Sequence, residues 1–334
     1  MRCLQHFFLI GLVFLTHLGA VAGSENDPQL KTALSVLIRE HKGDVSVVVR
    51  QLDGTGNVEF RHEADRPMPT ASLIKLPVMI ETYRQAAAGT LKLDALLELR
   101  DEDKVPGSGI LTSHFSSGMK LSLRDAVRLM IAYSDNTATN LVLDQVGLRS
   151  TSETMENWKL PHTKIHAKVF RRDTSIFPER SQEFGLGSTS ASEIVSLLEQ
   201  LHQDKLVNPE ACERMREHLL ACEDRGKLAR FLPREIKIAH KTGSVGNVRC
   251  DAGILYLPSG AVAVCVLTNK NEDRSWGDSN AAEILCGRIG EIVYKRFSTN
   301  GFVTEKSNEL RIGATGELVE ELQRTLNVRL DPSP

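Results

Sequence analysis

Three short groups of residues in this sequence carry side chains of the kind that nucleophilic catalysis needs. The first is Ser72-Leu73-Ile74-Lys75, which sets a hydroxyl and an amine three residues apart. On a helix this spacing places both side chains on one face, within reach of each other. A serine hydroxyl is a weak nucleophile until a base takes its proton, and a neutral lysine can be that base. The pair therefore favours a chemical role over a plain helix start.

The element that carries this pair is predicted to be a buried helix. The residues after Lys75 are almost all apolar as far as Ile80, and a helix that is apolar on all sides is buried. An unpaired lysine at its start would be costly, which again favours chemistry. Pro77 fits if Ser72 to Leu76 form the first turn, where few N–H groups have helical partners.

The second and third groups are Ser134-Asp135-Asn136 and Lys241-Thr242-Gly243. Each has a structural alternative, because serine, aspartate and asparagine cap helices and a Lys-Thr-Gly run suits a strand end with a turn. The Ser-x-x-Lys spacing alone should occur roughly once by chance in a chain of this length. All three groups in this order are much more specific. His240, beside the third group, is expected to be a packed residue rather than a base.

The N-terminal residues resemble a secretory signal peptide. Arg2 supplies a positive charge, residues 7–15 an apolar core, and Ala20-Val21-Ala22 a small-residue cleavage signal. We therefore expect a signal peptide at 1–22 and an exported protein, periplasmic or secreted, with no transmembrane anchor after cleavage. A membrane anchor is the alternative, but the apolar run is short for a membrane span.

Composition narrows the class of protein. The 334 residues are 41% hydrophobic and 25% charged with a net charge of −2, which is ordinary for one large globular domain or two coupled ones. Without a long basic run, nucleic acid is not an expected partner.

No cysteine or histidine spacing predicts a zinc site, and we expect no metal or cofactor. Five cysteines remain after Cys3 is removed, so they cannot all pair; buried free thiols or a Cys250–Cys265 bridge remain open.

Helices and strands alternate in a pattern that predicts an α+β fold. Strands are expected near both ends, at 44–52 and 58–61 and again at 235–240, 253–257 and 261–268. Helices are expected at 28–41, from Ser72 to about Gly89, in the block 93–146, and at 188–202, 209–225 and 279–297. The strands from both ends would form one antiparallel sheet, with the helical block as an insertion. Residues 161–187 show no clear periodicity, which is typical of a functional or mobile segment.

Residues 28–297 resemble a class A β-lactamase, or a close relative among the penicillin-recognising serine hydrolases. The resemblance rests on the three groups, the segment Val105-Pro106-Gly107-Ser108-Gly109-Ile110-Leu111 and the order of elements. It implies a three-layer α/β/α sandwich: a five-stranded antiparallel sheet flanked by helices, with an inserted all-α domain. The catalytic domain would span 23–299, with its α/β part at 23–65 and 205–299 and its helical part at 66–204.

The same resemblance implies how acylation would occur. Ser72 would attack an amide carbonyl, with Lys75 as the base, and Ser134 would pass a proton to the leaving nitrogen. A lysine pKa falls with burial and near a second cation, which in this family is Lys241. The backbone N–H groups of Ser72 and Ser244 would form the oxyanion hole.

The remaining implied roles concern the substrate. Asn136 would hold the amide of the substrate side chain, and Lys241 and Thr242 would bind its carboxylate. Gly243 would let the strand approach the ligand closely. Asp135 points inward in relatives, which implies a structural role.

The chain departs from the class A pattern in the loop that supplies the deacylating glutamate, typically within E-x-x-L-N. Matching residues 163–165 to the start of that loop places Val169 at the glutamate position and Asp173 near the asparagine. Asp173, Glu179 and Glu183 are candidate substitutes. Without a base to activate water, an acyl-enzyme would persist.

Residues 310–327 resemble the first half of a peptidoglycan-binding module, within a linker and tail at 300–334; an amphipathic tail helix is the alternative. Three functions stay open: a serine β-lactamase-type hydrolase, a D-alanyl-D-alanine carboxypeptidase acting on peptidoglycan, and a non-catalytic β-lactam sensor. Their expected ligand is a small β-lactam or a D-Ala-D-Ala peptide.

Overall fold

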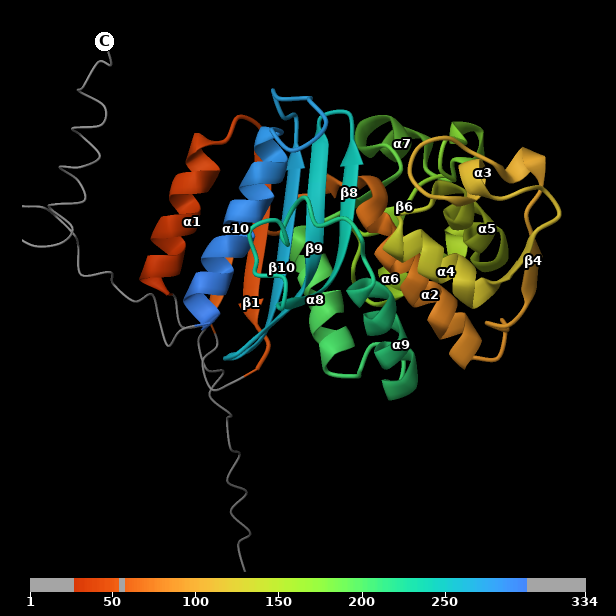
Figure 1. The fold of residues 1–334 in the computed structure, drawn as a ribbon, viewed down its shortest axis with the longest axis horizontal. Coiled ribbons are helices and arrows are strands. Elements are labelled where there is room, and N and C mark those ends of the chain that lie inside the picture. Colours follow the sequence, from red (N-terminus) through yellow and green to blue (C-terminus); the bar gives the residue numbers. More distant parts are fainter. Residues whose placement is uncertain (1–26, 54–57, 299–334) are drawn as a thin grey trace, which may run out of the picture.

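The computed structural model describes residues 27–53 and 58–298 (Figure 1). The predicted signal peptide at 1–22 and the predicted tail at 300–334 lie outside the described residues. Export and a cell-wall module therefore remain predictions, as do the domain boundaries. In the described part of the chain, no helix has both the length and the apolar character needed to cross a membrane.

The centre of the fold is a five-stranded antiparallel sheet. Its order is β2 (Glu59–His62), β1 (Asp44–Gln51), β10 (Gly260–Asn269), β9 (Val248–Leu257) and β8 (Lys237–Val245). Strands from the two ends of the chain thus lie side by side, as predicted. β8 and β9 are longer than predicted.

One face of the sheet is covered by α1 (Pro28–Glu40) and α10 (Ala281–Ser298), as Figure 1 shows. Asp27 is the N-cap of α1, because its carboxylate accepts hydrogen bonds from the N–H groups of Gln29 and Leu30 at 3.0 and 2.9 Å. Apolar side chains of both helices pack against the valines of β1 and β10.

The other face carries α8 (Ala191–His202) and the helical block. In this block α2 (Lys75–Ala87) packs against four helices: α4 (Leu123–Ala132), α5 (Asn136–Val146), α6 (Leu148–Asn157) and α9 (Pro209–Leu220). Every residue of α2 from Lys75 to Tyr83 is buried, which confirms the predicted buried helix. The α+β class and the layered antiparallel sheet are therefore confirmed.

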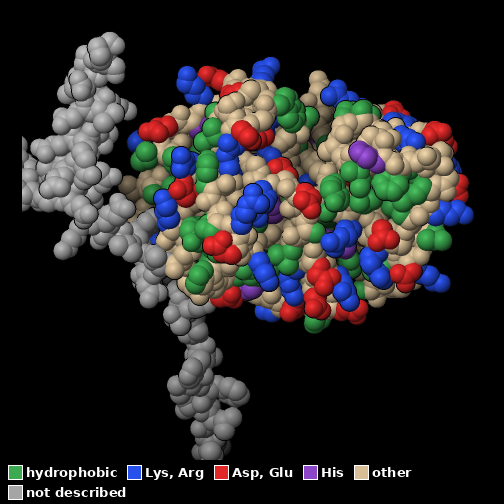
Figure 2. All heavy atoms as spheres, in the orientation of Figure 1, with side chains coloured by type: hydrophobic (Ala, Val, Ile, Leu, Met, Phe, Trp, Pro, Cys, Tyr) green, Lys and Arg blue, Asp and Glu red, His purple; other side chains and the backbone are tan. Residues whose placement is uncertain are grey.

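Short elements complete the fold. They are β3 (Met68–Pro69), η1 (Ala71–Ile74), β4 (Leu96–Glu98), η2 (Asp101–Asp103), α3 (Leu111–His114), β5 (Lys120–Ser122), β6 (Lys164–Ile165), η3 (Arg172–Thr174), α7 (Pro178–Phe184) and β7 (Gly187–Thr189). Several of them lie within 161–187, and they are too short to give a periodic pattern. In Figure 2, acidic and basic side chains are interspersed over the face in view, and neither sign dominates it.

Candidate active site

Ser72 lies in η1, the short 3₁₀ turn that leads directly into α2. The chain enters this turn through Ala71, whose φ of 45° lies in the left-handed region that residues with a side chain rarely adopt. The Ser72 side chain is partly exposed, and its hydroxyl has no hydrogen-bond partner among the described residues. This serine is therefore presented at a strained turn with its oxygen uncommitted.

Lys75 joins the first group to the second. Its side chain is fully buried, and Nζ donates to the Ser134 carbonyl at 2.7 Å, to Ser134 Oγ at 3.2 Å and to Asn136 Oδ1 at 2.9 Å. Burial, followed by the charge of Lys241, holds the pKa of Lys75 well below its ordinary value. Asp135 opposes this shift only as the smaller effect. The direction of this shift makes Lys75 a better candidate for the base than an ordinary lysine.

Lys241, on β8, brings in the third group. Its Nζ donates to Ser134 Oγ at 3.0 Å and to the Thr242 carbonyl at 2.7 Å, and the side chain is fully buried. Burial also lowers the pKa of Lys241. Ser134 Oγ therefore lies between two buried amines, at 3.0 and 3.2 Å, which is a suitable place for a proton relay.

Gly243 brings β8 into backbone contact with the nucleophile. A Cβ atom at this position would lie 2.4 Å from the Thr70 carbonyl oxygen, 2.9 Å from the Leu73 nitrogen and 3.0 Å from the Ser72 nitrogen. Any side chain would push the strand away from η1. Ser244 follows directly on the same strand, so the N–H groups expected to form an oxyanion hole come from two elements in close contact.

Asp135 has the structural role expected of it. It is the N-cap of α5, and its Oδ2 also accepts hydrogen bonds from the N–H groups of Ile110 and Leu111 at 2.7 and 2.8 Å. Asn136 Nδ2 donates to the Pro106 carbonyl at 2.9 Å. The loop that contains Pro106, Ile110 and Leu111 is therefore hydrogen-bonded to the second group.

Two polar residues for which the sequence predicted no role hold this arrangement. Ser108 Oγ donates to the Ser134 carbonyl at 2.7 Å, the same oxygen that Lys75 contacts. Asn140 accepts a hydrogen bond from the Val169 N–H at 2.8 Å and donates to the Val169 carbonyl at 3.1 Å. The only sequence signal for Asn140 is its position one helical turn after Asn136.

Val169 itself is 8% exposed, yet it belongs to neither apolar cluster of the fold. None of the three predicted substitutes for the glutamate is buried: Asp173, Glu179 and Glu183 are all exposed. Asp173 is paired with Arg171, which lowers the pKa of its carboxyl. The segment 161–187 therefore places no buried carboxylate at this side of the site.

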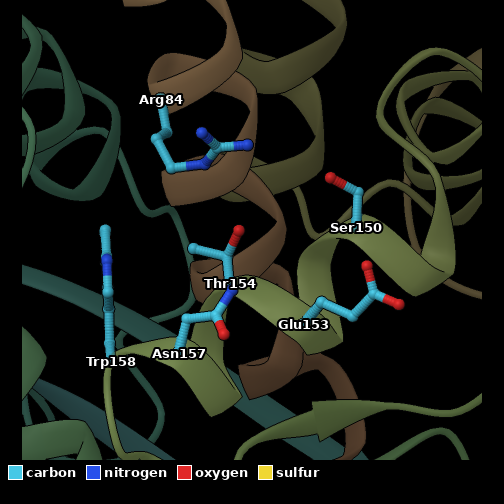
Figure 3. Close-up of a pocket in the computed structure, with 6 residues that line it drawn as sticks. All are labelled: Arg84, Ser150, Glu153, Thr154, Asn157 and Trp158. Carbon is cyan, nitrogen blue, oxygen red and sulfur yellow. The ribbon is translucent and has the colours of Figure 1, made fainter.

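The remaining features lie apart from the three groups. His240 is 1% exposed and bonded to Asp251, which agrees with the expected packed role. A surface pocket of about 240 Å³ lies against α2 and α6 (Figure 3), and its lining is mostly polar: Arg84, Ser150, Glu153, Thr154, Asn157 and Trp158. It contains no residue of the three groups. Within 27–53 and 58–298, no cluster of histidine, cysteine and acidic side chains is arranged to hold a metal ion.

Comparison with known proteins agrees with this geometry. A model described as "Beta-lactamase enzyme family" matches residues 29–297. Beta-lactamase 1 of Streptomyces cacaoi is 24% identical over 256 residues, which are 73% of this chain and 76% of that protein.

Solved structures give the same result. The structure of a beta-lactamase from Sphaerobacter thermophilus aligns with a TM-score of 0.69 at 29% identity, covering 80% of this chain and 95% of that one. The structure of PBP-A aligns with a TM-score of 0.71 at 21% identity, covering 82% and 97% of the two chains. At that identity PBP-A supports the fold alone.

Proposed function

Because the chain belongs to the beta-lactamase enzyme family, we propose that it opens β-lactam rings through an acyl-enzyme on Ser72 and releases the product slowly. The observation that supports this proposal is that Lys75 and Lys241 both bond to Ser134. An apolar residue, Val169, stands at the position where the resemblance leads us to expect a water-activating carboxylate.

Acylation would begin with proton transfer from Ser72 to Lys75. The lowered pKa of Lys75 supports this step, because a base works best when its pKa lies near the operating pH. The hydroxyl oxygen then attacks the lactam carbonyl, and the developing oxyanion is stabilised by the N–H groups of Ser72 and Ser244. Ser134, which contacts both lysines, would protonate the nitrogen as the ring opens.

Substrate binding would use the other members of the groups. The ammonium of Lys241 and the hydroxyl of Thr242 would receive the substrate carboxylate. Asn136 keeps one amide N–H on the Pro106 carbonyl, which leaves its second N–H for the substrate amide.

Deacylation needs a base that activates water, and the missing carboxylate at Val169 supports a slow step. A variant of PBP-A is described as an acyl-enzyme complex with penicillin G, so a persistent adduct is known on this fold. The same observation favours a second candidate, a D-alanyl-D-alanine carboxypeptidase that β-lactams inhibit. Both candidates share the Ser72 acyl-enzyme and differ in the natural substrate.

The test is intact mass against time after the protein is mixed with a penicillin. We expect one adduct of the mass of the intact penicillin, with a lifetime of hours. Ser72→Ala should abolish it, and Ser113→Ala, at an exposed serine on α3, should not. An adduct that clears within seconds would contradict slow deacylation. No adduct, or one that survives in Ser72→Ala, would refute the proposal.

A further inference from the structure

Phe170, the residue after Val169, is an exposed aromatic residue in a strained backbone conformation. Its φ is 59°, in the left-handed region where a bulky residue is an outlier. It is 62% exposed, although its side chain is large and apolar. In the described part of the chain, no other ring and no cation lies over it. Both features oppose folding, and strain of this kind is typical of residues that serve a binding or catalytic site.

The conformation of Phe170 belongs to a tight turn over residues 168–171. The Arg171 N–H donates to the Lys168 carbonyl at 3.1 Å and closes this turn. Phe170 occupies the third position, where a left-handed φ usually requires glycine or asparagine. A phenylalanine at this position therefore opposes the preference of the backbone.

The turn is attached to α5, the helix that carries Asn136. Asn140, one helical turn after Asn136, holds the backbone N–H and carbonyl of Val169 at 2.8 and 3.1 Å. Asp144, one turn further along, forms an ion pair with Lys168. Residues four positions apart lie on one face of a helix, so Asn136 and the turn share a rigid support. The position of the turn relative to Asn136 is thereby fixed.

The ring of Phe170 lies against Gly107, in the loop that is hydrogen-bonded to Asn136. A Cβ atom added to Gly107 would lie 3.4 Å from Cε2 of this ring and 2.7 Å from Nδ2 of Asn136. Ring and amide therefore flank the same small space beside Gly107. Because Asn136 is the residue proposed to hold the amide of the substrate side chain, the group beyond that amide would meet the ring.

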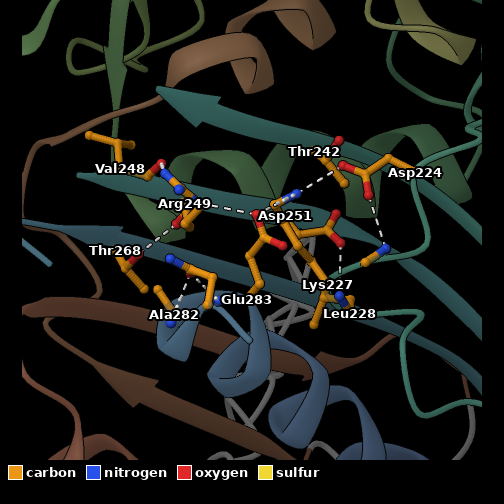
Figure 4. A network of polar contacts seen from close by, with 12 residues as sticks. Asp224, Lys227, Leu228, Thr242, Val248, Arg249, Asp251, Thr268, Ala282 and Glu283 are labelled. Atoms are coloured by element: carbon orange, nitrogen blue, oxygen red, sulfur yellow. Dashed lines mark hydrogen bonds and ion pairs between the residues drawn. The ribbon is translucent and has the colours of Figure 1, made fainter. Parts of the chain in front are cut away.

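Trp276 is a more exposed aromatic residue, but it has a partner within the protein. It is 67% exposed, and the guanidinium of Arg249 lies over its ring, 4.5 Å from the centroid. Arg249 is fully buried and forms an ion pair with Glu283 at 3.1 Å, within a network of polar contacts (Figure 4). Trp276 therefore covers a buried charge. Phe170 has no such role among residues 27–53 and 58–298.

We propose that Phe170 is a specificity-determining residue whose ring binds a flat apolar group, such as a phenyl ring, beyond the amide that Asn136 holds. This inference rests on the proposed function and names the class of substrate side chain that the site prefers. Aromatic rings associate in offset or edge-to-face arrangements, and the exposed ring of Phe170 has room for such a partner. The fixed turn reduces the conformational entropy that binding must remove.

The experiment compares two penicillins that differ only beyond the amide. Benzylpenicillin carries a phenyl group there, and in its acetamido analogue a hydrogen atom replaces the phenyl group. The second-order rate constant for adduct formation on Ser72 is measured for each compound by intact mass. For the native protein we expect benzylpenicillin to react about tenfold faster, because one apolar group in a partly open site gives only a modest gain.

Phe170→Asn removes the ring and supplies a residue that tolerates the left-handed conformation. The ratio of the two rate constants should fall from about ten to about one in this variant. Phe170→Tyr retains a ring and should retain the ratio. The matched control is Leu96→Asn, at a residue of β4 that is 69% exposed, and it should also retain the ratio. The same ratio in Phe170→Asn as in the native protein would overturn the proposal.

Urea unfolding separates this role from a structural one. If the ring serves binding, Phe170→Asn should unfold at the same urea concentration as the native protein or at a higher one, because the strain is relieved. A lower midpoint would mean that the ring stabilises the turn, which would also overturn the proposal. Equal rates for both penicillins in the native protein would refute this inference alone. No adduct with either penicillin would refute the proposed function, and this inference with it.

Discussion

Replacing Val169 by glutamate should convert a long-lived acyl-enzyme into one that turns over. The backbone of Val169 is held on both sides by Asn140, through bonds of 2.8 and 3.1 Å, so the new side chain would start from a fixed position. Because the site is 8% exposed, the carboxylate would be largely shielded, and burial would raise its pKa toward the range of a useful base.

The expected gain follows from general base catalysis, which typically contributes about 10²–10⁴ in rate. At about 1.4 kcal/mol per factor of ten, this corresponds to ~3–5 kcal/mol of barrier for deacylation. A lifetime of hours would become seconds to minutes. The cost is a buried polar group, which should lower the free energy of unfolding by about 1–3 kcal/mol.

The assay is the decay of the penicillin adduct by intact mass, with Val169→Gln as the matched control. Glutamine has the shape of glutamate but cannot act as a base, so it should share the loss of stability and keep the long lifetime. Equal lifetimes in the two variants would refute the reasoning, because Val169 would then not lie where the attacking water is activated.

Two further predictions concern Gly243 and the buried histidines. Gly243→Ala should slow acylation by about 10²–10³, because the new Cβ would displace β8 from the Ser72 N–H. The rate of labelling by a fluorescent penicillin measures acylation. A decrease in this rate of less than tenfold would contradict the prediction. Burial lowers the pKa of His166 and of His218 to about 4. Between pH 6.5 and 4 the unfolded chain therefore binds these protons more readily than the folded protein does. The free energy of unfolding should decrease as the pH is lowered through this range. The loss should be at most about 3 kcal/mol for each histidine before solvent screening. It should appear as a urea unfolding midpoint that falls as the pH is lowered, and His218→Gln should make this dependence on pH less steep. An equal slope in that variant would exclude His218 as a cause.

The long elements could be predicted from the sequence because their patterns are local. The cap at Asp27, the apolar face of α1 and the buried run after Lys75 each depend on neighbours within a few residues. The start of β9 could not be predicted in this way. Arg249 and Asp251 look like loop residues, yet both are fully buried, because Glu283 and His240 from distant segments neutralise them.

In the candidate site, too, the residues that could be predicted differ from those that depend on contacts between distant segments. Ser72, Lys75 and Ser134 belong to groups whose residue types indicate catalysis. The structure brings Lys75 and Ser134 into contact. Ser108 and Asn140 have no chemistry of their own, and their importance lies in which backbone atoms they hold. Such contacts depend on how a loop folds over a helix, which no local pattern encodes.

The pairing of β1 with β10 has a consequence for how the chain folds. Val48 lies opposite Cys265, so most of the described chain separates the two strands at the centre of the sheet. Pairings this distant in sequence are slow to form, because a long loop must close before they are gained. Until β10 is available, the valines of β1 are exposed on a strand with an open edge, a form prone to association with other chains. Formation of β10, in the last third of the chain, therefore determines when β1, in the first third, is protected from aggregation.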